Sequence, residues 1–534
     1  MMLQYSIIYL RKVKNMMNII SPLGDDMRDY LHDETKATGF AHSISFPESE
    51  NDVSDTLRAL YADRIPVTVQ GNRTGLTAGA VPFGGHIMSM TRMTRVLGLR
   101  IDEDGAVYVR VQPGLSLGVF RQLLAQRSFD AREWDAESRE CLERLRRMPA
   151  QYFPPDPTET SASLGGMVSC NSSGAKTYRY GATRPYVSAL RLVLADGDII
   201  ALRRGERFAS GRRFELKTQS GRLISGELPG YTMPSCKNAS GYYAADDMDL
   251  IDLFIGSDGT LGVITELELR LIEMPRVIWG INCFFRTEEQ ALDFVGYVRE
   301  TGSSLAAVEF FDGRALDILR GYDDGGVSVP DGFDSMIYVE LHADSDESAR
   351  EEIRDVGRAM QRAGGDERDT WCARSLPDRN RLLELRHRVP ESVNALIAHR
   401  KASDPAIAKV GSDMAVPDGR FRELVEIYHR DLEKNGFEYA IWGHAGNNHL
   451  HVNVLPRSAD DMRRGKAMFL EWARLVTAMG GTVSAEHGAG KNKANLLPVM
   501  YGEEGVREMA HLKSLFDPDC ILGRGNMFPE EWMK

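Results

Sequence analysis

Two glycine-rich segments, residues 71–82 and 154–181, constrain the fold of this chain more than any other feature. In residues 71–79 the glycines recur too often for a helix or a strand, so we predict a loop that follows a buried strand at 66–70. The backbone amides of such a loop can converge on a pyrophosphate, because glycine has no Cβ and adopts positive φ at little cost. Neither segment has the G-x-G-x-x-G spacing of a Rossmann nucleotide site, so that fold is not predicted.

Length and composition set broad limits on the fold and on the partners. A chain of 534 residues is too long for one hydrophobic core, so we expect two or three domains. Hydrophobic residues make up 43% and charged residues 27%, as in ordinary globular proteins. The net charge of −12 is not offset by a basic stripe, which argues against a nucleic-acid partner.

The six cysteines are scattered and include no Cys-x-x-Cys pair. This spacing disfavours a disulfide scaffold, a zinc ribbon and a built-in iron–sulfur cluster. Unpaired cysteines fit a reducing compartment, so we expect a cytoplasmic protein, with peripheral attachment to the inner face of the membrane as the alternative. No apolar run approaches the roughly 20 residues of a membrane span, so no transmembrane segment is predicted.

The first residues form a short apolar patch without the small-residue cleavage site of a signal peptide. We therefore expect that residues 1–15 reflect a misassigned start and that translation begins at Met16 or Met17. The intact mass of the natively expressed protein would test this expectation.

The hydrophobic periodicity changes along the chain. Before residue 275 it predicts mainly strands and turns, including a strand at 188–198 that enters a hairpin at Asp196-Gly197. After residue 275 strands alternate with amphipathic helices, with helices predicted at 284–300 and 345–363. This alternation is typical of an α+β sandwich.

Histidines are concentrated near the C-terminus, where two short segments contain His444, His449, His451 and His487 together with Glu486. Residues 450–454 alternate as a strand should, so His449, His451 and Asn453 are expected to face one side. Two histidines and one carboxylate suit a divalent metal, and a further histidine would be free to act as a base.

Several motifs follow one another in a specific order. They read GNRTGLTAGAVP at 71–82, PDPT at 155–158 leading to NSSG at 171–174, YGATR at 180–184 and GSDGTLG at 256–262. With the histidine cluster they resemble the FAD-linked oxidases of the vanillyl-alcohol oxidase superfamily. The branch most similar is that of the D-lactate, glycolate and D-2-hydroxyglutarate dehydrogenases, and the resemblance extends from about residue 30 to 528.

The resemblance implies an α+β fold in which a two-subdomain PCMH-type FAD-binding domain is joined to an α+β ferredoxin-like cap domain. The C-terminal segment is expected to return to the FAD-binding domain. The implied division is an N-terminal extension at 1–29, the FAD-binding domain at 30–274, the substrate or cap domain at 275–480 and a C-terminal segment at 481–534.

The resemblance also implies that FAD is held by the glycine-rich segments and by the start of the strand after GSDGTLG. The expected contacts are Gly71, Asn72, Arg73, Thr74, Gly75, Thr77, Pro155, Asp156, Gly165, Gly166, Asn171, Ser173, Gly174, Gly181, Gly262, Val263 and Ile264. The family usually has successive glycines where this chain has Asn72 and Arg73. Since residues 71–79 contain no His, Cys or Tyr, we predict that FAD binds non-covalently.

The resemblance assigns His444, His451 and Glu486 as ligands of a divalent metal. Zn²⁺ is the first expectation, and Mn²⁺ or Fe²⁺ also fits such a donor set. The chain departs from the family pattern Gly-Asp-Gly-Asn with Asn447-Asn448-His449. We expect His449 to be a strand residue that is hydrogen-bonded in the interior rather than an extra ligand.

The remaining site residues are also implied by the resemblance. His487 is expected to be the acid/base residue, with Asn453 as a polar contact close to it. Arg386 is expected to bind the substrate carboxylate, for which a guanidinium fork is well suited. Apart from the resemblance, Lys409 and Ser412, which precede the segment 413–417, are expected to line the pocket.

These features predict an FAD- and metal-dependent dehydrogenase that oxidises a D-lactate-like 2-hydroxy acid, by hydride transfer from its Cα to FAD, and passes the electrons to an external acceptor. The acceptor is left open among a quinone, a cytochrome, an electron-transfer flavoprotein and oxygen. D-2-Hydroxyglutarate and glycolate are alternative substrates, and a homodimer is expected on general grounds. A non-redox flavoenzyme similar to the alkyl-glycerone-phosphate synthases and an electron-transfer subunit are the less favoured classes.

Overall fold

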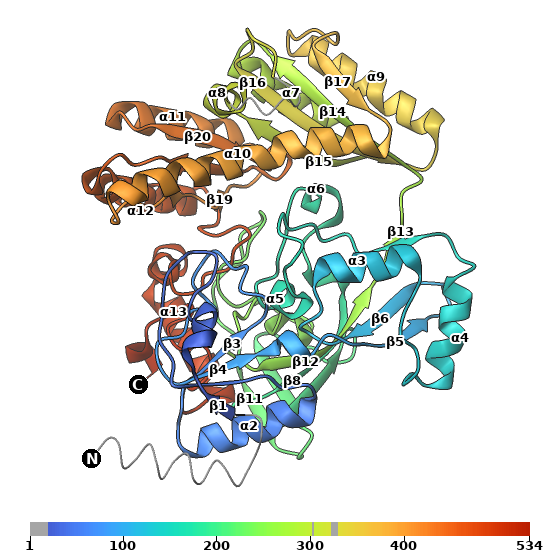
Figure 1. Cartoon of the computed structure of the whole chain (residues 1–534), viewed down its shortest axis with the longest axis vertical. Helices are drawn as coiled ribbons and strands as arrows, with labels where there is room; N and C mark the ends of the chain where they lie inside the picture. The colour runs from blue at the N-terminus through green and yellow to red at the C-terminus, as the bar shows by residue number, and fades with distance from the viewer. Residues whose placement is uncertain (1–19, 302–303, 322–328, 534) are drawn as a thin grey trace.

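The computed structural model describes residues 20–301, 304–321 and 329–533. The predicted start at Met16 or Met17 lies outside these residues. Figure 1 shows the described chain in two halves, a lower half that contains the N-terminal part and the last helix, and an upper half that contains most of the chain after residue 275. The mixture of helices and strands in both halves confirms the predicted α+β class.

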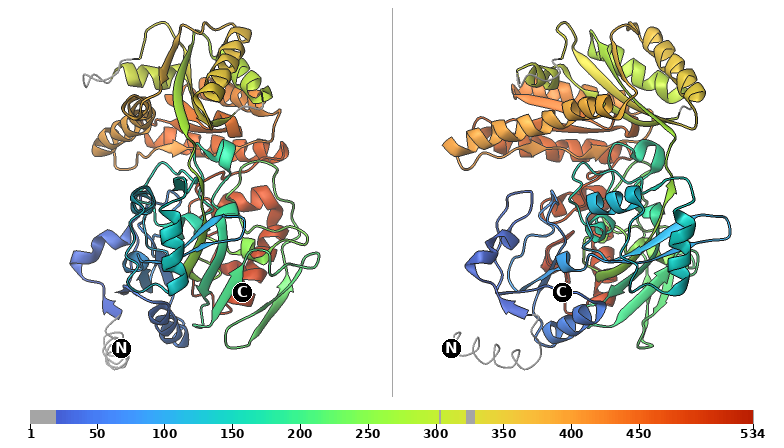
Figure 2. Two further views of the ribbon diagram at one scale, coloured as in Figure 1. Left: turned by 90° about the vertical axis from the view of Figure 1, so that its right-hand side faces the viewer. Right: turned by 45° about the vertical axis from the view of Figure 1, so that its right-hand side comes forward.

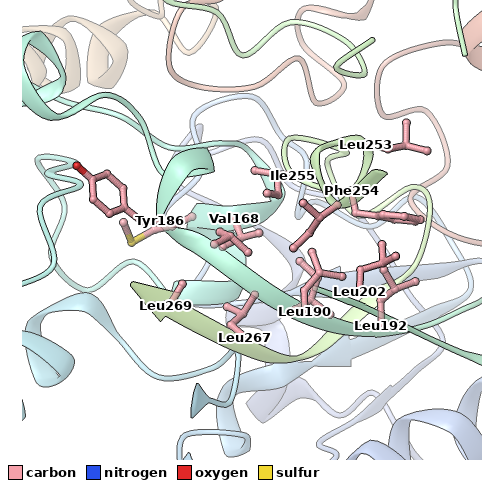
Figure 3. Packing of buried hydrophobic residues seen from close by; sticks show 14 of the residues in the cluster. Val168, Tyr186, Leu190, Leu192, Leu202, Leu253, Phe254, Ile255, Leu267 and Leu269 are labelled. Carbon is pink, nitrogen blue, oxygen red and sulfur yellow. The ribbon is translucent and has the colours of Figure 1, made fainter. Parts of the chain in front are cut away.

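The larger sheet of the lower half has five antiparallel strands in the order β5-β6-β12-β8-β9. The strands are β5 (Val96–Ile101), β6 (Val107–Val111), β8 (Val187–Val193), β9 (Ile199–Arg203) and β12 (Val263–Arg270). Alternate residues of β6 and β9 are buried, because successive side chains of a strand point to opposite faces. Figure 3 shows Leu190 and Leu192 of β8 beside Leu267 and Leu269 of β12, with Phe254 above the end of the sheet that carries Leu192.

The smaller sheet of the lower half has four strands in the order β1-β2-β4-β3, and its β2–β4 and β4–β3 pairs are parallel. The strands are β1 (Ile20–Pro22), β2 (Ser43–Ser45), β3 (Val67–Gln70) and β4 (His86–Ser89). Helix α2 (Glu50–Ala62) begins at a capping box between Ser49 and Asp52, which satisfies backbone amides at its first turn. The predicted strand at 66–70 is therefore confirmed as β3.

The lower half also contains two short strand pairs and four further helices before residue 275. The strands are β7 (Gln151–Tyr152), β10 (Arg213–Lys217), β11 (Leu223–Glu227) and β13 (Ile272–Glu273). The helices are α3 (Leu117–Gln126), α4 (Ala136–Leu145), α5 (Leu164–Ser169) and α6 (Thr177–Tyr180). The hairpin predicted at Asp196-Gly197 is confirmed, since β8 and β9 flank it and Gly197 has a φ of 82°.

The upper half is built on an eight-stranded sheet in the order β17-β14-β16-β15-β20-β21-β18, with β19 paired to β21. The strands are β14 (Val277–Phe285), β15 (Leu305–Phe311), β16 (Ser335–Ala343), β17 (Thr370–Ala373), β18 (Val410–Gly411), β19 (Met414–Ala415), β20 (Tyr439–Gly443) and β21 (His449–Val454). The sheet is covered on both faces. Residues of four helices share one core with it, and residues of two others share a second core.

The four helices on the first face are α7 (Glu288–Glu300), α9 (Asp346–Arg362), α11 (Phe421–Asn435) and α12 (Ala459–Ala478). The two on the second face are α8 (Gly313–Arg320) and α10 (Leu376–Ser403). The helix predicted at 345–363 is confirmed as α9. The helix predicted at 284–300 begins too early, because Phe284 and Phe285 still belong to β14 and Thr287 caps the helix that follows.

The chain returns to the lower half after α12. Helix α13 (Leu497–Phe516) contributes Val506, Met509 and Leu512 to the core of the lower half. Figure 2 shows this red C-terminal helix beside the lower half from two further directions. The predicted return of the C-terminal segment is thus confirmed, whereas the exact domain boundaries stay a prediction. Within the described ranges, no helix combines the length and the apolar character needed to cross a bilayer.

Candidate functional site

The histidine cluster is positioned by a hairpin of the eight-stranded sheet. Strands β20 and β21 pair in antiparallel register with Trp442 opposite His451, and residues 444–448 form the turn between them. Asn448 closes this turn with a φ of 53°, a conformation that asparagine tolerates better than most residues. The turn therefore presents His444 at the end of β20, next to the histidines of β21.

The three predicted metal ligands come together. One ligand atom from each of His444, His451 and Glu486 lies within 4.8 Å of the others, and His449 belongs to the same group. Nε2 of His444 is 3.1 Å from Oε1 of Glu486, and Nε2 of His451 is 3.5 Å from Oε2. Three imidazoles and a carboxylate at this spacing form a donor set that a divalent cation can occupy.

A second buried carboxylate, Glu309 of β15, orients His444. It accepts a hydrogen bond of 2.7 Å from Nδ1 of His444, which directs Nε2 toward Glu486. Burial opposes a charged imidazole, but Glu309 and Glu486 together raise the pKa of His444 above its ordinary value. A bound cation would replace that proton, since metal ligands must be deprotonated.

Glu309 also links His444 to Arg386. Oε2 of Glu309 is 3.2 Å from Nε of Arg386, which lies on α10 and is largely buried. Burial opposes ionisation of Glu309, yet His444 and Arg386 lower the pKa of this carboxyl to about 2. The predicted carboxylate-binding arginine is therefore held next to the metal-ligand cluster through one shared carboxylate.

Asp413 holds His487 on the other side of the cluster. Its Oδ2 is 3.1 Å from Nδ1 of His487 and also receives Lys493 at 2.6 Å and the Ser484 hydroxyl at 2.8 Å. Burial opposes the charge, but His487 and Lys493 lower the pKa of Asp413 well below its ordinary value. An imidazole that donates from Nδ1 to Asp413 keeps Nε2 as a proton acceptor. The ring of His487 stacks on that of His451, with centroids 5.6 Å apart.

His449 is buried on β21, as predicted, and its Nε2 contacts the buried carboxylate of Asp413. Neither ring nitrogen has an aligned hydrogen-bond partner among the described residues. Nε2 of His449 lies 3.0 Å from Oδ1 of Asp413, and that oxygen also lacks an aligned donor. Burial lowers the pKa of His449 to about 3, and it also lowers the pKa of His451, so both rings are held in the neutral form.

Both glycine-rich segments of the lower half reach this cluster. The Ser173 hydroxyl is 3.3 Å from Oε1 of Glu486, and the Thr77 hydroxyl donates to the carbonyl of His487 at 3.2 Å. Lys237 contributes a buried ammonium that pairs with Glu486. The lower half therefore supplies loops to the site, and the upper half supplies strand residues.

The predicted FAD-binding residues lie mostly on loops that pack against each other. The side chain of Asn72 donates to the Ser161 carbonyl, and a Cβ on Gly71 would come within 2.0 Å of the Ser163 hydroxyl, so the two loops touch where this glycine stands. A Cβ on Gly75 would meet no atom within 4 Å, which leaves open space beside that loop. These loops thus combine close packing with an accessible backbone, as a phosphate-binding site requires.

Other predicted cofactor contacts have different surroundings. Asp156 forms an ion pair of 2.9 Å with Arg121, which also donates to the Pro155 carbonyl. Gly181 ends α6 with a φ of 76°. Val263 and Ile264 begin β12 with side chains in the hydrophobic cores, so only their backbone could contact a cofactor. The remaining predicted contacts lie in the first loop (Arg73 and Thr74), in α5 (Gly165 and Gly166), in the turn after it (Asn171 and Gly174) and directly before β12 (Gly262).

Of three further predicted residues, two lie at the edge of the cluster. Asn453 is buried on β21 and donates to the carbonyl of His451. Ser412 donates from its hydroxyl to the Leu450 carbonyl and accepts from the amide of Val452, so it supports β21. Lys409 donates to Asn394 at 3.1 Å and is exposed, so the structure does not bring it to the metal ligands.

Sequence reasoning missed Glu309, Asp413 and Lys237. Glu309 is an acidic residue inside the apolar strand 305–311, and such a residue signals a buried partner. Asp413 stands in a similarly apolar segment directly after Ser412, which is one of the residues predicted to line the pocket. Lys237 follows a loop with no periodic pattern, so no local signal marked it.

Two family descriptions match this chain. "FAD linked oxidases, C-terminal domain" covers residues 274–527, and "FAD binding domain" covers residues 41–138 and 144–203. The chain belongs to the FAD-linked oxidases. Together the two matches span the halves that meet at the histidine cluster, and they confirm the resemblance inferred from the motifs.

Curated relatives of this FAD-linked oxidase align over almost their whole length. A D-lactate dehydrogenase of Anaerostipes hadrus is 28% identical over 95% of this chain and 94% of its own. A glycolate oxidase subunit GlcD of Bacillus subtilis is 26% identical over 95% of this chain and 93% of its own. A D-2-hydroxyglutarate dehydrogenase of Stutzerimonas stutzeri is 26% identical over 94% of this chain and 95% of its own.

Solved structures show the same fold at lower identity. A 4-ethylphenol oxidase from Gulosibacter chungangensis superposes with a TM-score of 0.65 at 15% identity, covering 99% of this chain and 98% of its own. An alkyldihydroxyacetonephosphate synthase superposes with a TM-score of 0.63 at 13% identity, covering 96% of this chain and 84% of its own. These likenesses establish the PCMH-type fold of this FAD-linked oxidase.

Proposed function

We propose that this FAD-linked oxidase is a metal-dependent dehydrogenase that oxidises a D-2-hydroxy acid of the D-lactate type to the 2-oxo acid. The observation that carries the proposal is the grouping of His444, His451 and Glu486 donor atoms within 4.8 Å, with the ring of His487 stacked beside them. The names of the curated relatives support the same reaction class. D-2-Hydroxyglutarate and glycolate remain the alternative substrates.

The residues present fit both groups that the reaction needs. The ring nitrogens of His449 and Oδ1 of Asp413 are buried and form no well-aligned hydrogen bond. Lone pairs are therefore left at the cluster to bind a cation such as Zn²⁺, with Mn²⁺ or Fe²⁺ as alternatives. When bound, the cation would stabilise the developing charge on the substrate oxygen. When bound through the glycine loops without a covalent link, FAD would accept the hydride from Cα of the substrate.

The chain's own residues divide the remaining work. His487 would accept the hydroxyl proton at Nε2, because Asp413 occupies its Nδ1. Arg386 would bind the substrate carboxylate, since Glu309 uses its Nε and leaves the two terminal nitrogens for a second carboxylate. Asn453, next to His451 on β21, would offer a polar contact.

The charges around Arg386 favour a substrate with a single carboxylate. Lys176 lies 3.4 Å from both Asp156 and Glu340, so this nearby cation is already paired. Lys409 donates to the neutral amide of Asn394 and keeps its charge, but it is exposed and is not brought to the metal ligands. This arrangement supports D-lactate over D-2-hydroxyglutarate.

Electrons would leave the reduced flavin for an external acceptor, such as a quinone, a cytochrome or an electron-transfer flavoprotein. A cytoplasmic location, with peripheral attachment to the membrane as the alternative, and a homodimer are retained as parts of the proposal.

The deciding experiment is anaerobic mixing of the flavin-bound, metal-replete protein with D- and L-2-hydroxy acids while the visible flavin absorbance is followed. We expect D-lactate to bleach the flavin and L-lactate to leave it oxidised. If no acid bleaches the flavin in protein with verified flavin and metal content, the proposal fails and a non-redox flavoenzyme becomes the better description.

A further inference from the structure

His449 and His86 are equally buried but differ in their hydrogen bonds. Both have 0% exposure. The ring nitrogens of His86 pair with the hydroxyls of Ser43 and Ser45 at 2.8 and 2.7 Å. The ring nitrogens of His449 have no aligned partner among the described residues. Nε2 of His449 still has Oδ1 of Asp413 at 3.0 Å, whereas Nδ1 has no partner among the described residues. Because buried polar groups are nearly always satisfied, Nδ1 is the atom that requires a partner from outside the chain.

The surroundings of His449 identify the kind of partner. Its ring centroid is 4.5 Å from that of His451 and 5.3 Å from that of His444. One donor atom from each of these three rings and from Glu486 lies within 4.8 Å of all the others. Ligands about 2.0–2.2 Å from a zinc ion are at most about 4.4 Å apart, so only a small contraction separates this group from a coordination shell.

We propose that His449 is a fourth protein ligand of the divalent metal, in addition to His444, His451 and Glu486. This inference rests on the metal site of the proposed function and adds a residue that departs from the family pattern, in which an asparagine stands at this position. It also replaces our expectation that His449 is a hydrogen-bonded strand residue.

The carboxylates around the cluster fit a role for His449 as a ligand. Glu309 contacts the ring of His444, and Asp413 lies 3.0 Å from Nε2 of His449. Metal-bound histidines commonly have their second nitrogen next to such a carboxylate, which orients the ring. With His449 included, each of these two histidines has its own buried carboxylate behind it.

A third imidazole changes which metals the site favours. Imidazole suits Zn²⁺, Fe²⁺ and Ni²⁺, whereas sites rich in carboxylate and water suit Mn²⁺ and Mg²⁺. Three imidazoles with one carboxylate should therefore increase the preference for Zn²⁺ over Mn²⁺. The cluster would also keep fewer positions open for the substrate than a site with two histidines.

The wild-type protein provides the first test. X-ray absorption of the full-length, flavin-bound chain loaded with one equivalent of Zn²⁺ should show three imidazoles bound to the metal. Two imidazoles would overturn the role of His449 while leaving the metal site of the proposed function intact. Failure to retain Zn²⁺ would overturn both.

A pair of variants provides the second test. Chelator competition measures the Zn²⁺ affinity of His449→Asn. We expect that affinity to fall at least about 10- to 100-fold, the loss usual when a group that supports a metal ligand is removed. The ratio of Zn²⁺ to Mn²⁺ affinity should also become smaller. His86→Asn, which removes an equally buried histidine far from the cluster, should leave both values unchanged. Unchanged Zn²⁺ affinity in His449→Asn with normal flavin content would overturn the inference, and if that variant does not fold, the wild-type imidazole count decides.

Discussion

Glu268 in the five-stranded sheet and Glu309 in the eight-stranded sheet are alike in their local properties. Both are strand carboxylates, with exposures of 3% and 2%, and in both burial is outweighed by cationic partners that lower the pKa to about 2. Their partners differ. Glu268 binds Arg100 and Arg203 on the surface of its sheet, whereas Glu309 binds residues that converge with the metal-ligand cluster.

This difference shows that a depressed carboxyl pKa does not by itself identify a functional site. Glu309 differs because its partner His444 lies beside further side chains that can bind a metal. Of these, His449 and Asp413 have buried atoms that form no well-aligned hydrogen bond. Around Glu268 the Ser188 hydroxyl also donates to the carboxylate, and although Nε of its partner Arg100 has no acceptor, an arginine nitrogen is a donor only and cannot bind a metal. Substitutions in the two sheets should therefore have separable effects on metal, substrate and stability.

The largest expected effect is on the rate of flavin reduction. It should appear in a variant of His487 but not in a variant of a histidine outside the cluster. His487→Asn should slow flavin reduction by D-lactate by about 10²- to 10⁴-fold, the usual contribution of a general base, with the flavin spectrum unchanged. The control is His429, which pairs with Glu288 at 2.8 Å in the upper half. D-Lactate should reduce the flavin of His429→Asn at the wild-type rate. Stopped-flow absorbance measures both, and fast reduction by His487→Asn would remove this residue from the mechanism.

The next effect compares the arginines that pair with the two carboxylates. Arg386→Lys keeps a charge but loses the guanidinium fork, so we expect KM for D-lactate to rise about 10- to 100-fold, the value of a charged hydrogen bond. Arg203→Lys, beside Glu268, should leave KM unchanged. Steady-state kinetics with an artificial electron acceptor would show this, and an unchanged KM in Arg386→Lys would place the substrate carboxylate elsewhere.

The two carboxylates themselves provide a third contrast. Glu309→Gln removes the acceptor that orients His444, so the affinity for Zn²⁺ should fall by about 10- to 100-fold. Glu268→Gln should lower the melting temperature without changing that affinity, because its partners lie outside the cluster. Zn²⁺ titration and thermal melting of both proteins test this pair. Equal Zn²⁺ affinities would mean that Glu309 is as purely structural as Glu268.

The smallest effect concerns two serines. The Ser173 hydroxyl contacts Glu486 at 3.3 Å, and that of Ser188 contacts Glu268 at 3.0 Å. Ser173→Ala should weaken Zn²⁺ binding by about two- to tenfold, as expected for one hydrogen bond, whereas Ser188→Ala should not. The same chelator competition would detect the difference. A loss in both variants would show that the two networks are coupled.

Local signals predicted the loop at 71–79, where glycines exclude regular structure, and the strand that places His449 and His451 on one side. The return of the C-terminal segment and the proximity of His444, His451 and Glu486 were instead implied by the resemblance that the ordered motifs carry. The early start of the helix at 284–300 was wrong because buried aromatic residues of β14 continue directly into an amphipathic pattern, and only the cap at Thr287 marks the change.

The missing parts of the prediction depend on contacts between distant segments. Nothing near Glu309 in sequence reveals that His444 and Arg386 lie on either side of it, because the three residues come from β15, the β20–β21 turn and α10. The same is true of Lys237, whose partner Glu486 comes from the segment after α12. Only the assembled sheet and loops bring these charges together.

The contact between Thr77 and His487 has a consequence for the biosynthesis of the protein. These residues are 410 positions apart in sequence, and the Ser173–Glu486 and Lys237–Glu486 contacts span 313 and 249 positions. Contacts of such sequence separation form late, since the intervening chain must first be ordered. The part of the lower half before residue 275 must therefore emerge from the ribosome and wait, with its contacts to Glu486 and His487 unmade, until nearly the whole chain has been translated. A chain that ends before residue 486 would lack the last carboxylate and the base, however well the rest of it folds.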